Sequence, residues 1–67
     1  MTFAEKMQTV RKQLFLSQEA MAKELGVSFA TVNRWEKGKC EPGYKAQKAF
    51  NELCEKNNID PNSLANN

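Results

Sequence analysis

The chain has 67 residues, of which 40% are hydrophobic and 27% are charged, and its formal net charge is +2. This length allows one domain with a single small core, and the composition is that of a globular rather than a disordered protein. With two cysteines and no histidine, the chain has no disulfide framework, and a structural zinc site is not expected. It shows no signal peptide and no apolar run of membrane-spanning length, so we expect a cytoplasmic protein.

Capping residues and apolar spacing predict two helices in the first part of the chain. Thr2 can cap a helix over roughly residues 3–14, where apolar side chains recur at steps of four, three and four. Ser17 is a natural N-cap for a second helix over roughly residues 18–25. Gly26 ends that helix at a position where left-handed backbone is usually needed.

The rest of the chain predicts three more helices and no strand. Ser28 caps a helix over roughly residues 29–37, and Gly38 ends it as Gly26 ends the one before. A loop rich in breakers covers residues 39–43, and a fourth helix runs over roughly residues 44–56. Asp60 followed by Pro61 predicts a short fifth turn through Leu64. The expected fold is all-α, a compact bundle of five short helices.

The second and third helices are joined by only about three residues, which favours a steep crossing of the helix-turn-helix kind. Ala22 is small where the two helices approach each other, and Gly26 permits the turn. Val32 and Trp35 are expected to fill the angle between them. Residues 1–67 thus form a single domain, and the core of the motif spans residues 17–37.

The segment from Leu16 to Ser28, LSQEAMAKELGVS, is followed by WEKGK at residues 35–39 and by Pro42. This pattern resembles the Cro-type or lambda-repressor-like helix-turn-helix family, also called the xenobiotic-response-element family. The resemblance covers roughly residues 3–56. It implies a small transcriptional regulator of prokaryotic or phage type that acts as a repressor and whose third helix enters the major groove of double-stranded DNA.

The resemblance also implies which residues hold the DNA backbone. Gln18 matches a glutamine that bonds a phosphate in the family, at a helix N-terminus that suits an anion. Arg11 and Glu36 match a family pair that we expect to stabilise the fold. The predicted phosphate-binding residues are Ser17, Gln18, Ser28, Thr31, Lys37, Gly38 and Lys39.

The predicted base-reading residues are Phe29, Ala30, Asn33 and Arg34, on the outer face of the third helix. Well-studied phage repressors have glutamines at three of these positions, so their base preferences do not transfer. Arg34 can bond guanine, Phe29 or Ala30 can contact a thymine methyl, and Asn33 can read adenine or bind phosphate. Alternatively, Phe29 folds back onto Val27 or a neighbouring helix as a hydrophobic staple.

An enzyme is a poor fit, since the usual general base, histidine, is absent and no glycine-rich phosphate loop is present. We expect no cofactor, metal or small-molecule ligand. Because one module touches few base pairs, we expect a homodimer on a palindromic operator. Residues from Ile59 to Leu64 are a candidate dimer segment, and the alternative is that they close the core. The alternative to a DNA-binding regulator is a protein-interaction adaptor or an antitoxin subunit with the same fold.

Overall fold

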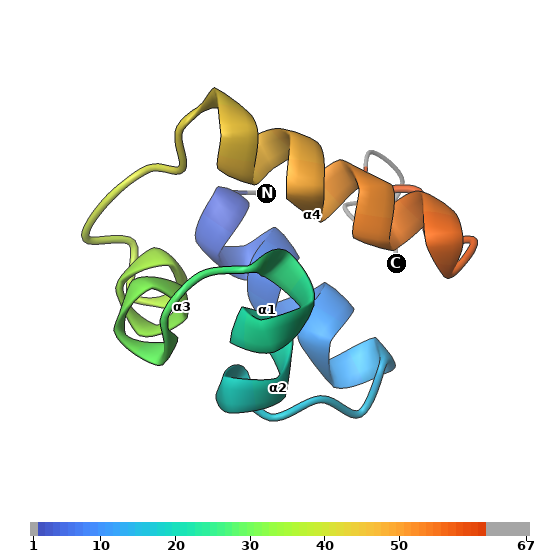
Figure 1. Cartoon of the computed structure of the whole chain (residues 1–67), viewed down its shortest axis with the longest axis horizontal. Helices are drawn as coiled ribbons and strands as arrows, with labels where there is room; N and C mark the ends of the chain where they lie inside the picture. The colour runs from blue at the N-terminus through green and yellow to red at the C-terminus, as the bar shows by residue number, and fades with distance from the viewer. Residues whose placement is uncertain (1, 62–67) are drawn as a thin grey trace.

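The computed structural model describes residues 2–61, and this part of the chain contains four α-helices (Figure 1). They are α1 (Phe3–Gln13), α2 (Gln18–Leu25), α3 (Phe29–Glu36) and α4 (Tyr44–Lys56). The all-α bundle expected from the sequence is confirmed, but the described residues hold four helices and not five. The predicted fifth turn begins at Asp60, and its continuation to Leu64 lies outside the described residues.

Side-chain caps fix where the first three helices begin. Thr2 Oγ1 accepts the backbone N–H of Glu5 at 3.2 Å, and the Glu5 carboxylate accepts the backbone N–H of Thr2 at 3.0 Å, which completes a capping box. Ser17 and Ser28 cap α2 and α3 in the same way, by accepting backbone N–H groups three residues ahead at 3.0 and 3.1 Å. The three predicted caps are therefore confirmed. Gly43 precedes α4 and offers no side chain for a cap.

All four helices end with the same backbone turn, in which one residue is left-handed. At each end, the residue after the left-handed one donates its N–H to the carbonyl five residues earlier, at 2.8 to 3.0 Å. Glycine occupies this position after α2 and α3, with φ of 70° and 72°. The backbone is more strained after α1 and α4, because the left-handed residues there carry side chains. The four left-handed residues are Phe15, Gly26, Gly38 and Asn58.

The core lies where the predicted inner faces of the helices meet. Phe3 of α1 packs edge-on against Trp35 of α3 and Phe50 of α4, with ring centroids 5.9 and 5.2 Å apart. This arrangement is favourable for aromatic pairs. Pro42, which the sequence indicates only as a loop breaker, is also buried. The buried hydrophobic side chains are Met7, Val10, Met21, Ala22, Leu25, Val32, Trp35, Phe50, Leu53 and Cys54.

The packing leaves α3 at one edge of the molecule (Figure 1). It contacts α2 and α1, while α4 packs on α2 and crosses the other side of the bundle. The short turn at Gly26 joins α2 to α3, as the helix-turn-helix prediction requires. Within residues 2–61, no helix has the length and apolar character needed to cross a membrane.

Candidate nucleic-acid interface

Helix α3 divides into a buried side and an exposed side. Val32 is completely buried, Trp35 is 5% exposed, and both pack in the core as predicted. On the opposite side Phe29 is 46% exposed. This exposure does not favour the staple alternative, in which the ring would be covered. The predicted base-reading residues thus lie on the accessible side, with Phe29, Ala30 and Arg34 exposed and Asn33 half-buried.

The exposed side of α3 and the segment after it carry cations without internal partners. Arg34, Lys37 and Lys39 are exposed. Their side chains form no ion pair or hydrogen bond with any residue of the part of the chain that the structure describes. Lys37 ends the helix and Gly38 turns the backbone, so that Lys39 directly follows the turn. Three unpaired cations within six residues make this surface attractive to an anion.

The one acidic residue among them, Glu36, is buried and compensated. Its side chain is 4% exposed, and its two carboxylate oxygens accept Arg11 Nε at 2.7 Å and Arg11 Nη2 at 3.0 Å. This two-pronged geometry is the strongest that an arginine and a carboxylate form. The carboxylate raises the pKa of Arg11, chiefly through these hydrogen bonds. The predicted pair is confirmed, and it removes the negative charge of Glu36 from the surface of α3.

Gln18 is also bonded to this pair, which the sequence did not predict. Its side-chain amide donates to Glu36 Oε1 at 3.1 Å. An amide nitrogen carries two hydrogens, so one N–H remains for another acceptor. Arg11 also donates from Nη1 to the carbonyl of Leu16 at 3.0 Å, just before the N-cap of α2. The Arg11–Glu36 pair therefore fixes the start of α2 relative to the end of α3.

Gln8 is a member of the same network that sequence reasoning missed. Its amide donates to the backbone carbonyl of Glu36 at 2.8 Å, at the C-terminal end of α3. A signal was available, because Gln8 and Arg11 are three residues apart and share one face of α1. That face holds no residue of the apolar stripe. Such a polar pair predicts a hydrogen bond to another helix only if the helix that packs against this face of α1 is already known.

The remaining predicted phosphate-binding residues surround the same surface. Ser17 is exposed, and its hydroxyl caps α2. Ser28 and Thr31 lie at the start of α3, and their hydroxyl oxygens are 2.8 Å apart. One of the two hydroxyls donates to the other, which fixes both side chains at the N-terminus of the helix. Their role in holding a phosphate stays a prediction.

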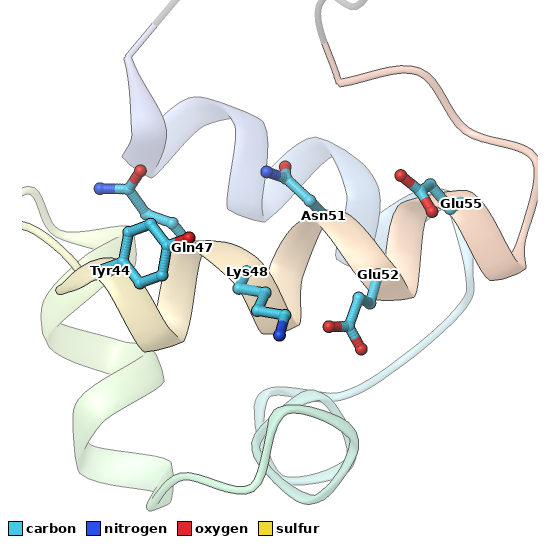
Figure 2. Close-up of a pocket in the computed structure, with 6 residues that line it drawn as sticks. All are labelled: Tyr44, Gln47, Lys48, Asn51, Glu52 and Glu55. Atoms are coloured by element: carbon cyan, nitrogen blue, oxygen red, sulfur yellow. The ribbon is translucent and has the colours of Figure 1, made fainter.

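A shallow pocket, separate from the predicted DNA-binding surface, lies along the outer side of α4. Figure 2 shows its side chains arranged along the helix, with Tyr44 at one end. Tyr44 is 86% exposed. The lining carries both signs of charge, although more of its surface is apolar than polar. The described residues contain no cluster of histidine, cysteine or acidic side chains able to hold a metal ion. The lining residues are Tyr44, Gln47, Lys48, Asn51, Glu52 and Glu55.

Comparison with known proteins agrees with this geometry. A model of the helix-turn-helix family matches residues 7–46, which is more than half of the chain. No curated protein sequence matches the chain significantly. Among solved structures, the fold is similar to a crystal structure of the P22 c2 repressor protein in complex with synthetic operator 9T in the presence of Tl+, with a TM-score of 0.74 and 28% sequence identity. The match covers 96% of this chain and 92% of that chain. The chain therefore belongs to the helix-turn-helix family, in its lambda-repressor-like form.

Proposed function

We propose that this chain is a sequence-specific double-stranded DNA-binding protein that acts as a transcriptional repressor by occupying its operator. The observation that carries the proposal is the division of α3. Its inner side chains are locked in the core, while its outer side and the following turn present Arg34, Lys37 and Lys39 without internal partners. The similarity to a repressor bound to its operator supports the same function. As a regulator of this kind, it requires no catalytic group.

In this proposal, α3 enters the major groove and its outer residues contact base edges. Arg34 bonds guanine through two N–H groups, while Phe29 or Ala30 contacts a thymine methyl. Asn33 is half-buried, so its reach is shorter than that of Arg34. In this proposal, sequence preference is therefore determined by Phe29, Ala30, Asn33 and Arg34.

Backbone contacts on both sides of α3 set its position in the groove. Gln18 has one amide N–H left for a phosphate after bonding Glu36, and it lies at the start of α2, where free backbone N–H groups attract anions. Lys37 and Lys39 hold the backbone on the other side. Because Glu36 bonds Gln18 directly and belongs to α3, the phosphate contact and the reading helix keep a fixed relation.

We further propose that two copies bind a palindromic site. Half-sites of helix-turn-helix dimers lie one helical turn apart, about 34–36 Å. The Cα atoms of this domain extend over 28 × 22 × 21 Å. The backbone of each copy is therefore shorter than the half-site spacing, as two copies on successive turns require. Residues from Ile59 to Leu64 remain our candidate dimer segment. Ile59 is partly buried against the core, and residues 62–64 lie outside the described residues.

Selection of bound sites from random duplex DNA tests the function. The wild-type protein, referred to below as the unchanged chain, is compared with Arg34→Ala and with the double variant Lys37→Ala/Lys39→Ala. We expect an enriched palindrome for the unchanged chain. Arg34→Ala should relax preference at one base pair by about 1–3 kcal/mol. The double lysine variant should weaken binding to every sequence and lower the slope of log Kd against log salt by about 2. The double variant Lys48→Ala/Lys56→Ala on α4 provides a matched loss of two charges outside the proposed interface.

An unchanged chain that fails to bind duplex DNA even at low salt would exclude this function. The alternative is then a protein-interaction adaptor or antitoxin with the same fold. Its most suitable surface is the concave outer side of α4, where Tyr44 is exposed (Figure 2). An enriched palindrome that is unchanged by Arg34→Ala would retain the function and exclude the guanine assignment.

A further inference from the structure

Phe15 does not contribute its side chain to the packing of the fold. It is 95% exposed, so its ring is almost entirely in water. Its φ is +57°, a left-handed backbone conformation that is costly for a residue with a Cβ. Equivalent positions after α2 and α3 hold Gly26 and Gly38. At Phe15 the chain therefore accepts backbone strain and gains no burial in return.

The segment around Phe15 is firmly held, so the ring is presented in a fixed direction. The N–H of Phe15 bonds the carbonyl of Lys12 at 3.1 Å, and the N–H of Leu16 bonds the carbonyl of Arg11 at 3.0 Å. Arg11 Nη1 in turn bonds the carbonyl of Leu16 at 3.0 Å. The flanking residues Leu14 and Leu16 both pack on the core. With both neighbours directed inward, the left-handed residue between them points its ring outward.

The surroundings of Phe15 favour an anionic partner. From Lys6 to Gln18 the chain has no acidic residue and three cations, Lys6, Arg11 and Lys12. Arg11 is neutralised by Glu36, so among residues 2–61 the exposed Lys12, three residues before Phe15, is the nearest unpaired cation in the sequence. Phe15 precedes the N-cap of α2 by two residues, so its Cα lies within about 8 Å of the Ser17 Cα. Next in the chain is Gln18, our proposed phosphate contact. Along the chain, an outward aromatic ring thus lies between an exposed cation, Lys12, and a proposed phosphate contact, Gln18.

We propose that Phe15 packs its ring against the sugar face of the DNA backbone, beside the phosphate held by Gln18. This inference rests on the proposed DNA-binding function. The deoxyribose offers an apolar surface between phosphates, and the contact removes the ring from water without reading a base. Phe15 thereby adds to affinity for any sequence. The strain at its backbone is retained because the ring is needed at this position.

The proposal predicts opposite effects of Phe15→Gly on stability and on DNA binding. Glycine relieves the left-handed strain, so Tm should rise by a few degrees. The Kd for a non-specific duplex of about 30 base pairs, three helical turns, should rise roughly five- to ten-fold. The slope of log Kd against log salt should stay unchanged, because no charge is removed. Phe15→Tyr keeps the ring and should keep the affinity.

Asn58→Gly is the matched control. Among residues 2–61, Asn58 is the other left-handed residue with a side chain, and it follows α4, which carries none of the proposed DNA contacts. It should raise Tm without changing Kd. Phe15→Gly binding as tightly as the unchanged chain would overturn the proposal, as would an equal loss in Asn58→Gly. If the unchanged chain itself fails to bind the duplex at low salt, the proposed function fails, and the role of Phe15 fails with it. A loss confined to Phe15→Gly supports the proposal.

Discussion

Replacing Glu36 with alanine should strongly destabilise the domain. The carboxylate is 4% exposed and accepts two N–H groups of Arg11 and one of Gln18. Without it, Arg11 keeps a charge in a site where its side chain is only 18% exposed. Breaking a buried ion pair from one side costs about 3–5 kcal/mol. A domain of this length has a total stability of roughly 3–10 kcal/mol, so the loss is a large fraction of the whole.

The assay is urea unfolding followed by far-ultraviolet circular dichroism, with thermal unfolding beside it. At about 4 °C or more per kcal/mol, the expected fall in Tm is at least about 12 °C. The double variant Arg11→Met/Glu36→Leu removes both charges and should be more stable than Glu36→Ala, because no unpaired charge remains. The exposed Glu19 is a suitable control, since Glu19→Ala should change stability by no more than about 0.5 kcal/mol. A cost below about 1 kcal/mol for Glu36→Ala would refute the reasoning.

Three further predictions concern other parts of the fold. Hydrogen bonds from the backbone and hydroxyl of Thr2 lower the pKa of Glu5 below its ordinary value of 4.5. The ionised Glu5 carboxylate therefore stabilises the fold above pH 4.5, and this contribution is lost as the pH falls through the lower pKa of the folded state. Glu5→Gln should consequently lower Tm at neutral pH but not in strong acid. Burial, and to a lesser extent the charge of Asp60, raise the pKa of Cys54. A disulfide exchange reagent should therefore label the exposed Cys40 rapidly and the buried Cys54 only when the domain unfolds. Rapid labelling of both thiols in the folded protein would contradict this. Gly38→Ala should cost about 1 kcal/mol from backbone strain alone, because a Cβ there meets nothing within 4 Å, and an unchanged midpoint in urea would disprove it.

Much of the fold was predictable because its signals are local. Thr2, Ser17 and Ser28 cap their helices through bonds that span three residues, so the sequence alone places them. Gly26 and Gly38 adopt the left-handed conformations that their positions require. Apolar spacing identified the buried sides of α1 and α4 for the same reason, since a helix repeats its faces at a fixed interval.

The parts that were not predictable depend on contacts between distant residues. Gln18 bonds Glu36 eighteen residues away, and Gln8 bonds the same residue's backbone from α1. Neither contact follows from spacing, because it depends on how three helices pack together. The left-handed conformation of Phe15 was also missed, since only glycine and asparagine signal such a position in a sequence. The residues that read DNA bases stay a prediction, because exposed side chains such as Arg34 make no hydrogen bond or ion pair within residues 2–61 that would fix their role.

The two-sided character of α3 has a consequence for how this domain can diversify. Val32, Trp35 and Glu36 hold the helix, whereas the side chains of Phe29, Ala30 and Arg34 are directed away from the core and contribute little to folding. The outer positions can therefore be randomised as a set while the scaffold stays intact. A library built this way can be sorted for new targets without first repairing stability, and natural drift can alter what the domain recognises by the same route.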